Sequence, residues 1–225
     1  MPRKRSSLIK SSKDQDNWYP EYFAQTWYKN TFLVQDPNQI ARTTGPESEW
    51  NNIFDSGCNF VCLAMILGID PARLASELAK QSYFREDADL PARTLRGKPC
   101  DLVWDQNVPN EEVRSIQLTN FWHSGLMRRV SVTISLVEVH TSKSYAEGRR
   151  IASKLHRRKR HVVCGPEAHS HLLAGTGPDG YFVWDPDDTQ RSVEENLGGQ
   201  VTLRRLFHEN KSEPIEFWEY QADLI

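Results

Sequence analysis

Apolar residues occupy nearly every position from Cys58 to Leu67, and this is the most distinct hydrophobic segment of the chain. A helix that is hydrophobic on all sides is buried inside a protein rather than lying on its surface. Gly68 follows the segment, and glycine is common where a helix ends in the left-handed conformation. We therefore predict a buried helix over residues 58–67 that forms the centre of the domain.

A second helix is predicted immediately after the buried one. Asp70 and Pro71 have the form of a helix start, with a capping carboxylate followed by proline at the first helical position. Residues 72–79 then place apolar side chains at helical spacing. The same spacing predicts a helix over residues 146–155, and we also assign a short helix to residues 110–118.

Later segments of the chain have the patterns of strands. Residues 130–139 alternate apolar and polar positions, which predicts a half-buried strand. Shorter apolar runs follow at residues 161–164, 172–174 and 181–184, and the glycine-rich turn sequence at 177–180 joins the last two as a β-hairpin. Helices followed by a mainly antiparallel sheet predict an α+β fold.

The beginning of the chain differs from the rest. Residues 1–16 are polar, rich in Lys, Arg and Ser, and show no apolar periodicity. Ordering such a segment costs backbone entropy with little burial in return, so we expect a basic mobile tail. Residues 17–225 are then expected to form one domain, with an aromatic-rich short helix within residues 18–34 that packs on its body.

The overall composition is typical of a water-soluble globular protein. Hydrophobic residues make up 38% of the 225 positions and charged residues 26%, and the formal net charge is −2. The basic start is not followed by the apolar stretch of a secretion signal, and no run is long enough to span a membrane. We expect a cytoplasmic protein, or one delivered from the cytoplasm as an effector, with neither a membrane nor a nucleic-acid partner.

Four cysteines, Cys58, Cys62, Cys100 and Cys164, are too sparse and irregular to indicate a disulfide framework. Cys58 differs from the others because it opens the predicted buried helix. The unpaired N–H groups and the dipole at a helix start favour a thiolate and lower the pKa of the thiol. By position alone, the more common role of such a cysteine is that of a small buried apolar residue.

The segment at residues 58–68, Cys-Asn-Phe-Val-Cys-Leu-Ala-Met-Ile-Leu-Gly, resembles the nucleophile helix of papain-like cysteine peptidases. The likeness is greatest to the compact bacterial branch related to the peptidases that remove double-glycine leaders. The resemblance implies a papain-like fold with Cys58 as the nucleophile. In this family a glutamine six residues earlier donates to the oxyanion, and Asn52 stands at that position here, with Asn51 and Glu49 as neighbouring alternatives.

A second segment shares a spacing with the same family. In papain-like enzymes the base histidine opens a strand, a glycine follows six residues later, and an Asn or Asp lies ten residues beyond it; His169, Gly175 and Asp185 match this spacing. A hairpin would bring the start of one strand beside the end of the next, so Asp185 could orient the histidine toward the thiol. The resemblance thus implies a triad of Cys58, His169 and Asp185. His171 is an alternative base, because strand alternation would put it on the same face as His169.

Such a triad would carry out thiol-dependent hydrolysis of a peptide or carboxamide bond, as a cysteine peptidase, a glutamine deamidase or an acyl transferase, on a protein or peptide substrate without a cofactor. The alternative is a non-catalytic papain-like module that binds a protein partner, which the departure at Asn52 favours. Cys164, His169, His171 and Asp185 could also bind zinc, but their spacing suits a triad better, and we expect no metal.

A basic run follows the helix predicted over residues 146–155. It consists of Arg157, Arg158, Lys159 and Arg160. Such a concentration of positive charge could bind an acidic partner protein. The simpler interpretation is a solvated helix end whose cations complement the helix dipole.

Overall fold

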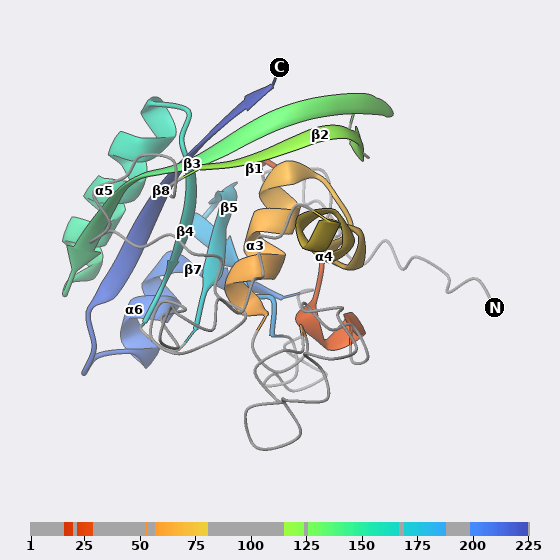
Figure 1. Cartoon of the computed structure of the whole chain (residues 1–225). Coiled ribbons are helices and arrows are strands. Elements are labelled where there is room, and N and C mark those ends of the chain that lie inside the picture. Colours follow the sequence, from red (N-terminus) through yellow and green to blue (C-terminus); the bar gives the residue numbers. More distant parts are fainter. Residues whose placement is uncertain are drawn as a thin grey trace, which may run out of the picture.

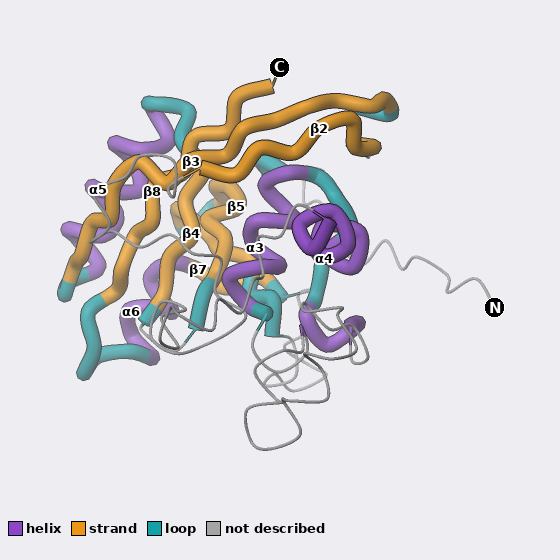
Figure 2. Tube along the Cα trace, viewed as in Figure 1, coloured by secondary structure: helices purple, strands orange, loops and turns teal. Residues whose placement is uncertain are grey.

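The computed structural model describes residues 16–19, 22–28, 53, 57–80, 115–123, 126–166, 169–187 and 199–224. These residues form an α+β domain in which one twisted sheet has helices on both faces (Figures 1 and 2). The sheet has eight strands in the order β2-β3-β8-β4-β5-β6-β7, with β1 pairing to β5 beyond the end of β4. Every strand pairing among the described residues is antiparallel, which confirms the predicted α+β class.

The bounds of the elements are close to the predictions where the hydrophobic pattern is strong. The strands are β1 (Asp16–Asn17), β2 (Ser115–His123), β3 (Arg128–Ser142), β4 (His161–Gly165), β5 (His171–Gly177), β6 (Gly180–Trp184), β7 (Gln200–Thr202) and β8 (Ile215–Leu224). The helices are the 3-10 helix η1 (Gln25–Tyr28) and the α-helices α3 (Cys58–Leu67), α4 (Pro71–Lys80), α5 (Tyr145–Arg157) and α6 (Leu203–Glu209).

Helix α3 lies in the larger of two hydrophobic cores, as predicted. Every residue from Phe60 to Leu67 is buried, and burying a Leu, Ile, Val, Met or Phe side chain contributes roughly 1.5–3 kcal/mol. Gly68 ends the helix in the left-handed conformation, at φ 62°. The core continues into the face of the sheet that carries Val163 and Trp184.

Helices α5 and α6 cover the opposite face of the sheet (Figure 1). The change of face follows from strand alternation, because Val162 and Val183 belong to this second core while their neighbours Val163 and Trp184 belong to the first. Helix α5 begins where the Ser144 side chain accepts a hydrogen bond from the Glu147 backbone N–H. The site described below therefore lies on a sheet that is packed from both sides.

One predicted element is wrong, and one central element was not predicted. Residues 115–118 belong to strand β2 rather than to a helix, because Ile116 and Leu118 pair with Ile134 and Val132 of β3. Residues 110–114 lie outside the described part of the chain. Strand β8 fills the middle of the sheet between β3 and β4, although the C-terminal sequence carries no strand signal that we identified.

The predicted tail over residues 1–16 lies outside the described residues, except for Asp16, which begins β1. Among the helices that the structure describes, none has the length and apolar character needed to cross a membrane.

Candidate active site

Three elements bring the predicted site residues together. Cys58 is the first residue of α3, His171 is the first residue of β5, and Asp185 directly follows the last residue of β6. The hairpin register pairs Leu172 with Trp184, so the start of β5 lies beside the end of β6. His169 precedes β5 and is not part of the strand, so the alternation that would have placed both histidines on one face does not extend to it.

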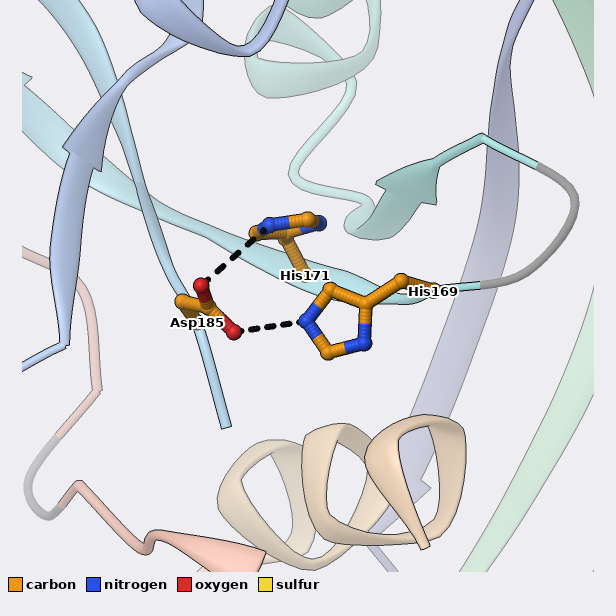
Figure 3. Close-up of side chains that lie close together, drawn as sticks. All are labelled: His169, His171 and Asp185. Atoms are coloured by element: carbon orange, nitrogen blue, oxygen red, sulfur yellow. Dashed lines mark hydrogen bonds and ion pairs between the residues drawn. The ribbon is translucent and has the colours of Figure 1, made fainter. Parts of the chain in front are cut away.

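Asp185 lies between two histidines, and each one faces a different carboxylate oxygen (Figure 3). The Nε2 of His169 is 2.6 Å from Oδ1, and the carboxylate can only accept, so the ring N–H donates this hydrogen bond. The Nε2 of His171 is 3.7 Å from Oδ2. The side chain of His171 is 7% exposed and that of His169 is 27% exposed, so His171 lies deeper in the protein.

The thiol of Cys58 interacts with His169 and Ser170. Because Nε2 of His169 is bound to Asp185, Nδ1 is the ring nitrogen left to bond the sulfur, and Figure 3 shows this nitrogen pointing away from Asp185. The backbone and side chain of Ser170 also hydrogen-bond the sulfur. Sequence reasoning missed Ser170, because alternation along a strand would have pointed it away from the histidines.

The environment favours a thiolate at Cys58. Burial alone would raise the pKa of this thiol, but the hydrogen bond from His169, the positive charge of that ring and the hydrogen bonds from Ser170 outweigh burial and hold the pKa below its usual value. Burial lowers the pKa of His169, yet its hydrogen bonds to Asp185 and Cys58 raise the pKa to about 10. The opposite shifts indicate a thiolate–imidazolium pair.

The other described cysteines have the opposite electrostatic character. Burial raises the pKa of Cys164 to about 12, and burial together with nearby negative groups raises the pKa of Cys62 well above its ordinary value. Both side chains lie in hydrophobic cores. Cys58 is thus the described cysteine whose surroundings support nucleophilic chemistry, while Cys100 lies outside the described residues.

Backbone and side-chain contacts hold Asp185 in place. Its Oδ1 accepts a hydrogen bond from the Asp187 backbone N–H at 2.9 Å, and its carbonyl oxygen accepts from the Tyr22 hydroxyl at 2.6 Å. Its own N–H donates to the Gly199 carbonyl at 2.6 Å. Burial would raise the pKa of Asp185, but hydrogen bonds and positive charge from His169 and His171 hold the pKa well below its usual range. The carboxylate is therefore ionised and fixed.

Gly165, at the end of β4, allows the segment that carries both histidines to lie close against this strand. A Cβ on this residue would lie 1.9 Å from the carbonyl oxygen of His169 and 3.3 Å from Nδ1 of His171. The His169 N–H closes the connecting turn by donating to the Pro166 carbonyl at 3.2 Å. The Gly-Pro pair at this turn is a sequence signal that could have identified it.

The two histidines and Asp185 also have the spacing of a metal site, since their ligand atoms all lie within 4.8 Å of one another. A pair of imidazoles with a carboxylate is a donor set that can hold zinc. Cys164, the fourth zinc ligand considered from the sequence, does not belong to this group.

The predicted oxyanion residue Asn52 and its alternatives Asn51 and Glu49 lie outside the described residues.

Of the basic run, Arg157, Arg158 and Lys159 are exposed, whereas Arg160 turns inward. Its Nε lies 3.0 Å from Oε1 of the buried Glu219, and its Nη1 bonds the side chain of Gln221.

No protein-family model matches this chain, and neither does any curated protein or solved structure.

Proposed function

We propose that this protein is a papain-like cysteine hydrolase in which Cys58 is the nucleophile, His169 the base and Asp185 the residue that orients the base. The observation that carries the proposal is the position of His169, whose Nε2 bonds the Asp185 carboxylate and whose ring also acts on the Cys58 thiol. A cysteine that opens a buried helix and a histidine and aspartate brought together by a hairpin also support the papain-like assignment.

The reaction begins with attack of the Cys58 thiolate on the carbonyl carbon of a peptide or carboxamide bond. The new C–S bond moves an electron pair to the carbonyl oxygen, and the backbone N–H of Cys58 and Asn52 are the proposed donors to this oxyanion. When the intermediate collapses, the C–N bond breaks and the His169 imidazolium gives its proton to the leaving amine or ammonia.

A thioester on Cys58 then remains to be hydrolysed. Neutral His169 takes a proton from water, the hydroxide adds to the thioester carbon, and collapse releases the acid and restores the thiolate–imidazolium pair. An amine in place of water would make the same site an acyl transferase.

We assign His169 rather than His171 as the base. His169 and Ser170 act on the Cys58 thiol, whereas the interaction of His171 is with the far oxygen of Asp185. His171 is therefore a positioning residue, which together with His169 keeps the Asp185 carboxylate ionised and aligned.

The test is alkylation with iodoacetamide at about pH 6, where an ordinary thiol is almost wholly protonated. We expect Cys58 to react at least about tenfold faster than N-acetylcysteine at the same pH, with the modified residue located by peptide mass spectrometry. Cys58→Ala should abolish this fast phase and Cys62→Ala should retain it. If Cys58 reacts no faster than the free amino-acid derivative, the non-catalytic binding module, which the family departure at Asn52 favours, is the better assignment.

A further inference from the structure

A cavity of about 460 Å³ lies at the turn of the β5–β6 hairpin, at the opposite end of these strands from His169 and Asp185. The strands rise about 3.3 Å per residue, which separates the cavity from the proposed active site by roughly 20 Å. Its walls are the turn at residues 177–180, the first two turns of α5 and the junction of β7 with α6. The two helices among these walls, α5 and α6, cover the same face of the sheet (Figure 1).

Two arginines from different helices line this cavity, and they differ from their immediate neighbours. Arg150 on α5 is paired with Glu147 at 3.9 Å, and Arg205 on α6 is paired with Glu209 at 2.6 Å. Arg149 and Arg204, which line the cavity, have no carboxylate partner among the residues that the structure describes. Among the described residues, Arg149 and Arg204 therefore lack the carboxylate partner that Arg150 and Arg205 have, and both line the cavity.

Aromatic packing holds Arg204 in position. Its guanidinium carbon lies 5.2 Å from the centre of the Tyr145 ring, a cation–π geometry. Tyr145 also lines the cavity, and its ring packs edge-on against Phe207 with a centroid distance of 6.2 Å. Phe207 packs directly against α5. A Cβ on Gly148 of this helix would lie 2.3 Å from the Phe207 ring, so the helix and the ring leave no space between them. A guanidinium held in this way loses less side-chain entropy when it binds a ligand.

We propose that this cavity binds a phosphate group. Two guanidinium groups and the Tyr145 hydroxyl offer more donors than the two oxygens of a carboxylate can accept, whereas the additional oxygens of a phosphate let it bond all three groups at once. Among the described residues of the lining, Asp179 is the one acidic residue, which leaves two cations against one anion there. The phosphate can be that of a small phosphorylated metabolite or of a phosphorylated protein segment, because both present the same group.

The experiment titrates the full chain with inorganic phosphate at constant ionic strength and follows the midpoint of thermal unfolding, which rises when a ligand binds the folded state. The variant Arg149→Gln/Arg204→Gln should weaken phosphate affinity at least about tenfold. The matched control, Arg150→Gln/Arg205→Gln, removes the same charge from the same helices and should retain wild-type affinity. Glycerol 3-phosphate and a phosphoserine peptide, titrated in parallel, identify which source binds more tightly.

Three results would overturn the proposal. The first is equal loss of affinity in the two double variants, which would show that only general positive charge is involved. The second is stabilisation by acetate that equals stabilisation by phosphate. The third is the absence of any phosphate-dependent change in the wild-type protein.

Discussion

The two histidines beside Asp185 have different environments although they are two residues apart in the chain. His169 is the more exposed and reaches the thiol, while His171 is almost fully buried and reaches the other oxygen of the carboxylate. Their rings meet edge-on with a centroid distance of 4.6 Å. A single carboxylate thus restrains both rings, and this arrangement makes their separate roles measurable.

Replacing each histidine by alanine should separate these roles. His169→Ala removes the positive partner of the thiolate, so the pKa of Cys58 should rise toward its unperturbed value of about 8.5. His171→Ala should change this pKa much less, because His171 acts through Asp185. The measurement is the pH dependence of Cys58 alkylation in the wild type and both variants. A larger shift in His171→Ala would make His171 the base, and no shift in either variant would argue against the triad.

Asp185 predicts a specific loss of stability in acid. Its pKa is held well below the usual value in the folded protein, so its contribution to stability is present above the unfolded pKa of about 4 and is lost as the pH falls below it. Urea unfolding between about pH 3 and pH 6 should show that acid lowers the free energy of unfolding less in Asp185→Asn than in the wild type. Asp179→Asn, in the exposed hairpin turn, serves as the control, and its free energy of unfolding should change with pH as that of the wild type does.

At the scale of elements, the site depends on close approach between β4 and the segment that leads into β5. Gly165 makes this approach possible at the site, and Gly148 makes a similar approach possible between α5 and Phe207 on the other face of the sheet. Both positions are too crowded for a Cβ, so an added methyl group at either one must displace its neighbours. Replacing each of the two glycines by alanine therefore gives a matched pair of variants.

Gly165→Ala and Gly148→Ala should both lower the free energy of unfolding, by about 1–3 kcal/mol, as overpacking does. Gly165→Ala should also slow Cys58 alkylation at about pH 6, because the displaced His169 no longer stabilises the thiolate. Gly148→Ala should leave the pH profile of alkylation unchanged. Equal profiles in the two variants would show that Gly165 has a purely structural role.

At the scale of the whole molecule, the basic run that begins at the last residue of α5 divides into two parts. Arg157, Arg158 and Lys159 are exposed, whereas Arg160 pairs with a carboxylate between strands. That carboxylate belongs to Glu219, and the Nε2 of His140 also lies 3.1 Å from its Oε2. Strand β8 thus carries a buried charge in the middle of the sheet, and residues distant in the sequence neutralise it.

Arg160→Ser should destabilise the protein by about 1–3 kcal/mol, which is less than the cost of a fully unpaired buried charge because His140 remains. Arg158→Ser, at an exposed position of the same run, should change the free energy of unfolding by no more than about 0.5 kcal/mol. Denaturant unfolding of both variants provides the comparison. If Arg160→Ser is as stable as Arg158→Ser, the ion pair with Glu219 has no net stabilising effect.

Local patterns in the sequence were sufficient for the elements whose stability comes from their own residues. The apolar run of α3 with Gly68 at its end, the Asp-Pro start of α4 and the glycine turn of the β5–β6 hairpin each specify an element through neighbours a few positions apart. Because the same hairpin joins β5 to β6, the approach of Asp185 to the histidines was also predictable.

Only the tertiary structure determined the contacts between distant segments. Strand β8 enters the centre of the sheet, and residues 115–118 become a strand, because long-range pairing with β3 satisfies their backbone hydrogen bonds. The inward turn of Arg160 depends on Glu219, and the place of His169 depends on its leaving the strand register before β5 begins. A sequence pattern contains the preferences of neighbouring residues, whereas these contacts depend on which distant segments pack together.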